Sequence, residues 1–115
     1  MVFADPITLV TTASLESLGD GVQPARFRAT LVVETDIAWV EDDWLGRTMT
    51  LGDATIRVGG PVPRCAVIDH HPETGARDAR LLKALAQIRP TNRAGEPMFG
   101  VYASVVTPGR VAVTR

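Results

Sequence analysis

A series of short β-branched and apolar runs, each bounded by turn-forming residues, is the feature that most limits how this chain can fold. The clearest pair covers residues 48–51 and 54–58, which flank Gly52-Asp53. A two-residue loop that begins with glycine is typical of a β-hairpin, because glycine adopts positive φ without steric cost. Apolar and polar residues alternate along residues 54–58, as in a strand that buries one face. We therefore predict a hairpin here.

Further runs of the same kind extend the β pattern along the chain. Residues 7–11 and 30–35 are rich in β-branched side chains, and residues 99–105 alternate between apolar and small or polar ones. Pro108-Gly109 then predicts a turn into residues 110–113, which would close a second hairpin. Strands separated by turns roughly every 8 to 12 residues are typical of a β-barrel or a β-sandwich.

Two segments have helical rather than strand patterning. Residues 13–18 predict a short helix, with Thr12 or Ser14 as its N-cap. Residues 78–88 predict a longer helix with Asp78 as its cap, and its apolar stripe consists of Leu81, Leu82, Leu85 and Ile88. The sequence therefore predicts a mainly β fold with one or two peripheral helices.

Length and composition exclude several classes of protein. The chain has 115 residues, the length of one domain, and its 12 basic and 13 acidic residues give a net charge of -1, without the basic surplus of nucleic-acid binders. No apolar run reaches the roughly 20 residues that span a bilayer, and the first residues lack the basic start of a signal peptide. A single cysteine cannot form an intrachain disulfide. We therefore expect a cytoplasmic protein without membrane or nucleic-acid partners.

Cys65 is the strongest candidate for chemistry, because a thiolate is both a nucleophile and a soft metal ligand. Residues 59–64 contain two prolines and two glycines, and we expect them to form a stiff loop that leads into a strand at residues 65–68. Arg64 would favour the thiolate, although neighbouring side chains on an extended chain face opposite sides. The alternative is that Cys65 is a small buried apolar residue with no chemical role.

Two other clusters of polar residues have simpler interpretations. The run Asp69-His70-His71-Pro72-Glu73 invites a metal site, but adjacent side chains on an extended segment diverge, so we expect a solvated hairpin tip. The acidic run at residues 41–43 could supply paired carboxylates, but it lies in a turn-like stretch, and we expect a solvated turn or a helix cap.

Short sequence motifs in a fixed order give the chain a resemblance to one family, the MOSC domain (molybdenum cofactor sulfurase C-terminal domain). These motifs extend over nearly the whole chain at family-like spacing. They are Leu9-Val10-Thr11-Thr12-Ala13-Ser14-Leu15, Arg26-Phe27-Arg28, Leu31-Val32-Val33-Glu34, Asp42-Asp43-Trp44-Leu45-Gly46-Arg47, Leu51-Gly52-Asp53, Gly60-Pro61-Val62-Pro63-Arg64-Cys65, Pro72-Glu73-Thr74-Gly75, Phe99-Gly100-Val101-Tyr102 and Pro108-Gly109-Arg110-Val111.

The resemblance implies a fold, a cofactor and a set of site residues. MOSC domains fold as a strongly bent β-barrel with peripheral helices, and their motif cysteine either carries sulfur as a persulfide or ligates molybdenum. Cys65 matches that cysteine. The cofactor is molybdopterin with molybdenum, and Arg28 matches an arginine expected at its phosphate. The rest of the predicted cofactor-binding set is Asp5, Thr30, Arg64 and Tyr102.

Two roles follow from the resemblance, and the residues do not separate them. With metal, the domain would reduce N-hydroxylated substrates and need a redox partner. Without metal, Cys65 would relay sulfur from a pyridoxal-phosphate cysteine desulfurase.

Two departures from the family pattern support an alternative. The family's Pro-Asn is Ala29-Thr30 here, which replaces an amide with a hydroxyl. The chain is also short, and we expect it to cover the C-terminal part of such a domain without its N-terminal strands. Either the chain would then be a fragment of the domain, or an oligomeric partner would complete the open barrel edge. The alternative function is a non-catalytic binding module with a degenerate cofactor site.

Overall fold

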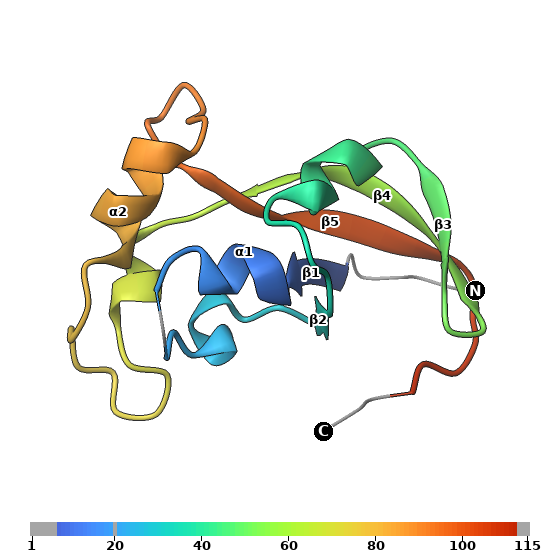
Figure 1. Cartoon of the computed structure of the whole chain (residues 1–115), viewed down its shortest axis with the longest axis horizontal. Coiled ribbons are helices and arrows are strands. Elements are labelled where there is room, and N and C mark those ends of the chain that lie inside the picture. Colours follow the sequence, from blue (N-terminus) through green and yellow to red (C-terminus); the bar gives the residue numbers. More distant parts are fainter. Residues whose placement is uncertain (1–6, 20, 113–115) are drawn as a thin grey trace.

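A curled, half-barrel sheet of five strands runs through the described part of the chain, residues 7–19 and 21–112, in a computed structural model (Figure 1). Its strand order is β2-β1-β5-β4-β3; β1 and β2 are parallel, and the other neighbours are antiparallel. The mainly β prediction is therefore confirmed. The strands are β1 (Ile7–Thr11), β2 (Leu31–Val33), β3 (Thr48–Leu51), β4 (Ala54–Pro63) and β5 (Met98–Thr107).

The helices are short and lie around the sheet. They are α1 (Thr12–Glu16), α2 (Leu81–Ile88) and the 3-10 helices η1 (Pro24–Phe27), η2 (Val40–Trp44) and η3 (Ala66–Asp69). Among the residues that the structure describes, no helix is long and apolar enough to cross a membrane.

Both predicted helices exist, but the predicted caps were wrong. Thr11 is the N-cap of α1, because its hydroxyl accepts the Ser14 N–H. The second helix begins only at Leu81, and Asp69 rather than Asp78 accepts the N–H of Leu82 at 2.9 Å. Asp78 is instead paired with a distant arginine. Tertiary contacts thus outweigh the local capping preference.

The apolar stripe of α2 is shorter than predicted. Leu85 is fully buried, and Leu81 and Leu82 pack against the same core cluster. Ile88 is 55% exposed, so it does not belong to the buried face.

The predicted hairpin at residues 48–58 is confirmed, and the predicted closing hairpin is not. Strands β3 and β4 pair from Thr48↔Arg57 to Leu51↔Ala54 around Gly52, whose φ is +59°. Residues 110–112 do not return along β5. They cross the β3–β4 turn, where the Asp53 N–H donates to the Arg110 carbonyl at 2.9 Å. Val113 lies outside the described residues.

Gly100 divides the core into two clusters. Phe99 packs with Val10 in one cluster and Val101 packs with Leu9 in the other, although residues two apart on a regular strand face the same side. Gly100 has φ +82°, which interrupts that alternation. The strand β5 therefore buries side chains on both faces of the sheet.

Candidate functional site

Cys65 lies at the end of a strand and not at the start of one. The segment predicted as a stiff loop is the second half of β4, which pairs with β5 through Pro61↔Val101 and Pro63↔Met98 with irregular register. The chain then turns into η3, whose N-cap is Cys65. The prediction of a strand at residues 65–68 was wrong. The thiol of Cys65 is exposed, so the residue is not a buried apolar one.

Arg64 points the other way, into the core. Its side chain is 8% exposed, and its guanidinium donates to the carbonyl of Phe99 at 2.9 Å through Nε and to that of Phe27 at 2.7 Å through Nη1. The guanidinium carbon lies 5.3 Å from the Phe27 ring centroid and 5.9 Å from that of Phe99. Arg64 therefore links the end of η1 to the start of β5 through these two hydrogen bonds.

The remaining nitrogen of this guanidinium is unusual. Nη2 of Arg64 is buried and has no hydrogen-bond partner. Burial lowers the pKa of Arg64 to about 10, while the nearby Tyr102 and Cys65 groups act to raise it. Even at that pKa the group stays charged at neutral pH. A fixed positive charge thus lies within electrostatic range of Cys65 and Tyr102.

Arg28 follows η1 in a left-handed conformation, with φ 50° and ψ 36°. The side chain is exposed and lines a pocket of about 340 Å³. Thr30 lies two residues further on, where its hydroxyl accepts the Thr8 N–H at 3.0 Å. Part of the hydrogen-bonding capacity of Thr30 is therefore used within the fold.

Tyr102 is the β5 register partner of Thr8, so Thr30, Thr8 and Tyr102 occupy neighbouring positions across the sheet. Its side chain is 38% exposed and borders a separate pocket of about 250 Å³. Cys65 lines neither this pocket nor that of Arg28. The structure therefore places Thr30 and Tyr102 on opposite sides of Thr8 and brings Arg64 into electrostatic range of Cys65, but it does not gather all of them in one cavity. Asp5 lies outside the described residues.

Glu41 is the polar residue whose environment the sequence did not reveal. The acidic run was predicted to be solvated, but Glu41 is fully buried. Its carboxylate accepts the Ser14 hydroxyl at 2.7 Å and the Thr11 hydroxyl at 3.0 Å, and Ser14 Oγ accepts the Trp39 N–H at 2.7 Å. The sequence gives no local signal for this, because the partners are 27 and 30 residues away.

The two adjacent histidines are held by the loop that follows η3. His70 Nδ1 lies 2.9 Å from the Gly75 carbonyl, and His71 Nδ1 accepts the Glu73 N–H at 3.1 Å. Within residues 7–19 and 21–112, no group of three or more His, Cys, Asp or Glu side chains is arranged to hold a metal ion. Both histidines border the Arg28 pocket.

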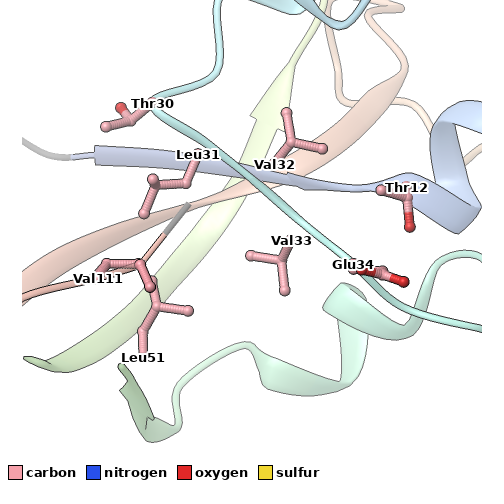
Figure 2. Close-up of a pocket in the computed structure, with 9 residues that line it drawn as sticks. Thr12, Thr30, Leu31, Val32, Val33, Glu34, Leu51 and Val111 are labelled. Carbon is pink, nitrogen blue, oxygen red and sulfur yellow. The ribbon is translucent and has the colours of Figure 1, made fainter. Parts of the chain in front are cut away.

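A larger hollow of about 520 Å³ opens beside β2 (Figure 2). Figure 2 shows Leu31 and Val33 of β2 facing it, with Leu51 and Val111 at its far side. Strand β2 is the last strand of the sheet, and its outer edge has no strand partner among the described residues. A partner chain that completes this edge remains a prediction.

Comparison with known proteins points to one family. A family model described as MOSC domain matches residues 4–114. Molybdenum cofactor sulfurase 3 of Aedes aegypti is 35% identical over 97 residues, which are 84% of this chain and 11% of that protein. Molybdenum cofactor sulfurase of Anopheles gambiae is 36% identical over 92 residues, 80% of this chain and 10% of that protein.

A second type of relative is covered more fully. Mitochondrial amidoxime reducing component 2 of Rattus norvegicus is 30% identical over 119 residues, 94% of this chain and 35% of that protein. The chain thus spans about a tenth of the length of the sulfurases and about a third of the rat protein. Because the family model extends over residues 4–114 and the sheet is a bent half-barrel, the chain belongs to the MOSC domain family.

Proposed function

We propose that this domain handles the molybdenum cofactor or its sulfur through Cys65. One observation carries the proposal: the only thiol of the chain is exposed, and the residue before it keeps a buried guanidinium nitrogen without a partner. A thiolate is the soft ligand that molybdenum and sulfur chemistry require. The relatives named for the molybdenum cofactor support the same assignment.

The residues present fit such a group. The exposed Arg28 is a donor suited to anionic oxygens, and the buried guanidinium of Arg64 supplies a fixed positive charge near Cys65. In this proposal Cys65 ligates the metal, Arg28 and Thr30 hold the phosphate end, and Tyr102 borders the pterin. Asp5 completes the proposed set. A molybdenum centre bound there would supply two-electron redox chemistry, with N-hydroxylated compounds as the proposed substrates.

The second form of the proposal is sulfur relay. Here the Cys65 thiolate attacks the terminal sulfur of a persulfide on a pyridoxal-phosphate cysteine desulfurase. A new S–S bond forms on Cys65, and the donor cysteine leaves as a thiolate. Lys83 is the only lysine of the chain and is exposed on α2, so we assign pyridoxal phosphate to the partner and not to this domain.

A specific observation favours one alternative, a non-catalytic module with a degenerate site. Arg28 and Tyr102 line different pockets, and Cys65 lines neither. Thr30, at the position of the family asparagine, is engaged with Thr8 of β1. These features fit a domain that has kept the family fold and lost cofactor binding.

Metal and pterin analysis tests the proposal. The protein is produced with molybdate supplied, and molybdenum content, pterin fluorescence and intact mass are measured for the parent chain and for Cys65→Ala. Molybdenum and pterin in near-equal amounts, with the metal lost in Cys65→Ala, would support the metal form. A mass increase of one sulfur atom on Cys65 without metal, after incubation with a cysteine desulfurase and cysteine, would support relay.

The opposite results identify the alternative. Protein free of molybdenum, pterin and added sulfur, in both the parent chain and Cys65→Ala, would refute the proposal and support the non-catalytic module. Cys65→Ser serves as a second variant, because its hydroxyl keeps the shape of the thiol without its softness as a ligand.

A further inference from the structure

A hollow of about 480 Å³ lies between the end of η3 and the beginning of α2, two elements that contact each other. We call it the charged hollow, because five of its six lining side chains carry a charge. The lining residues are Asp69, Arg77, Asp78, Ala79, Arg80 and Lys83. Cys65 and Arg28 do not line it, so it is a separate feature of the surface.

Both carboxylates of the charged hollow are already engaged within the fold. Asp69 is buried, and its Oδ1 accepts the Leu82 N–H at 2.9 Å. Asp78 Oδ1 lies 2.9 Å from Nη2 of Arg26, whose side chain is 5% exposed. The two acidic groups thus serve the interior of the protein and leave most of the cationic charge at the rim uncompensated.

The cationic side chains of the charged hollow are exposed to solvent. The Arg77 side chain is 68% exposed, and its Nη2 lies 3.9 Å from Asp69 Oδ2, close to the outer limit of an ion pair. Arg80 and Lys83 are exposed, and neither forms an ion pair with any residue of the ranges 7–19 and 21–112. Two positive charges, with a third that is weakly paired, are therefore available to a ligand.

Arg80 and Lys83 also lie where a helix does not favour cations. Arg80 is the N-cap of α2, and Lys83 lies in the first turn, which contains no acidic residue. The N-terminus of a helix carries a partial positive charge, so carboxylates stabilise it and cations do not. Residues three apart are neighbours on a helix surface, so the two cations also repel each other. Negative charge from outside the chain would relieve both effects.

The size and the charge of this surface distinguish between acidic ligands. The chain has a net charge of -1, so a nucleic acid or an anionic bilayer that extends beyond the charged hollow would meet a surface without a basic surplus. A short run of aspartate and glutamate side chains can stay within its rim. Arginine guanidinium groups pair with carboxylates through two parallel hydrogen bonds, which favours such a run.

We propose that Arg77, Arg80 and Lys83 form a docking surface for an acidic segment of a partner protein. Cys65 caps the start of η3, and Asp69 ends it. Because a 3-10 helix rises about 2 Å per residue, the backbone of Cys65 lies roughly 8 Å from that of Asp69. A protein docked here would therefore lie beside the exposed thiol. The exchange of sulfur or electrons with Cys65 rests on the proposed function, whereas the docking does not.

Amide NMR during a titration with hexaglutamate at low ionic strength tests the docking surface. We expect saturable shifts of the backbone signals of residues 77–83, which sodium chloride at about 0.5 M should abolish by screening. Lys83→Glu should weaken hexaglutamate binding roughly fivefold or more, because an attraction becomes a repulsion. The same variant should keep or raise the Tm, because it places a carboxylate in the first turn of α2.

The matched control is Arg93→Glu, which changes the net charge by the same amount as Lys83→Glu. Residues 91–97 form the loop at the opposite end of α2 from residues 70–77 (Figure 1), and Arg93 is exposed. Its affinity for hexaglutamate should stay within about twofold of the parent's, because salt screens distant charges. The docking surface is refuted if hexaglutamate shifts none of residues 77–83, or if Arg93→Glu weakens binding as much as Lys83→Glu.

Two further arms test the class of partner and the independence from Cys65. Oligothymidylate and vesicles that contain phosphatidylserine are titrated in the same way. Tighter binding of either one than of hexaglutamate at residues 77–83 would overturn the assignment to an acidic protein segment. Cys65→Ala should bind hexaglutamate as the parent chain does. The docking surface therefore stands even if no molybdenum or sulfur is found on Cys65, and it fails independently if hexaglutamate does not bind.

Discussion

Glu41 offers the sharpest test of the physical reasoning, because its carboxylate is fully buried and its only side-chain partners among the described residues are two hydroxyl groups. In Glu41→Ala, the Ser14 hydroxyl would lose its acceptor inside the protein, whereas the Thr11 hydroxyl could still donate to Ser14 Oγ at 2.8 Å. A buried polar group without a partner costs roughly 1–3 kcal/mol, and the cavity adds about 1 kcal/mol or more. Because Glu41→Ala also removes the cost of burying a carboxylate, part of this loss in the free energy of unfolding is offset. We expect a net loss of about 3 kcal/mol.

Glu41→Gln should behave differently. Thr11 Oγ1 also lies 2.8 Å from Ser14 Oγ, so it can donate to Ser14 and accept from the new amide. With the shape kept and each group paired, we expect a loss of about 1 kcal/mol.

Urea unfolding followed by circular dichroism measures both variants. A loss of about 3 kcal/mol corresponds to a fall in Tm of roughly 12 °C for a domain of this size. The double variant Ser14→Ala with Glu41→Ala should lose less than the sum of the single losses, because the two residues share one bond. The reasoning is wrong if Glu41→Ala stays within about 1 kcal/mol of the parent, or if Glu41→Gln is as damaging as Glu41→Ala.

Three further predictions concern Arg64, Gly100 and Cys65. Arg64→Met should lower the free energy of unfolding by about 2–4 kcal/mol in urea melts, because two buried carbonyls lose their donor. Since burial lowers the pKa of Arg64 to about 10 in the folded state, the unfolded chain binds more protons than the folded chain above that pH. The stability difference between parent and Arg64→Met should therefore be constant from neutral pH to about 9 and move in favour of the parent above about 10. Gly100→Ala should lose about 2 kcal/mol or more, because its φ is +82° and a Cβ would lie 2.7 Å from the Leu9 carbonyl oxygen. Gly60→Ala, with no atom within 4 Å, is the control, and equal losses in the two variants would contradict this explanation. Iodoacetamide should alkylate the exposed Cys65 of the native protein within about tenfold of the rate in urea, and complete protection would contradict the exposure of the thiol.

Local patterns predicted much of the fold. The hairpin around Gly52 and the alternation after Gly100 depend on neighbouring residues, so they can be interpreted from sequence. The closing hairpin failed because Asp53 binds residue 110 across the chain. Glycine and proline in the second half of β4 suggested a loop, whereas pairing with β5 decides their conformation.

The candidate site was predictable only in part. Cys65, whose thiol is exposed, was singled out by residue type and family resemblance. Arg64 was predicted to favour its thiolate and to bind the cofactor, whereas its side chain is buried in the core. The burial of Glu41 and the meeting of Arg28 with His70 depend on contacts between segments far apart in sequence. Residue pattern alone carries no information on such contacts, because they are set by how the ends of the sheet close.

The acceptors of Arg64 have a consequence for how this chain tolerates sequence change. The guanidinium binds two backbone oxygen atoms, and every amino acid supplies such an atom. Replacement of the rings at positions 27 and 99 would thus keep both hydrogen bonds from Arg64, whereas replacement of the arginine would remove them. Divergent descendants of this domain should accordingly vary more freely at the two aromatic positions than at position 64.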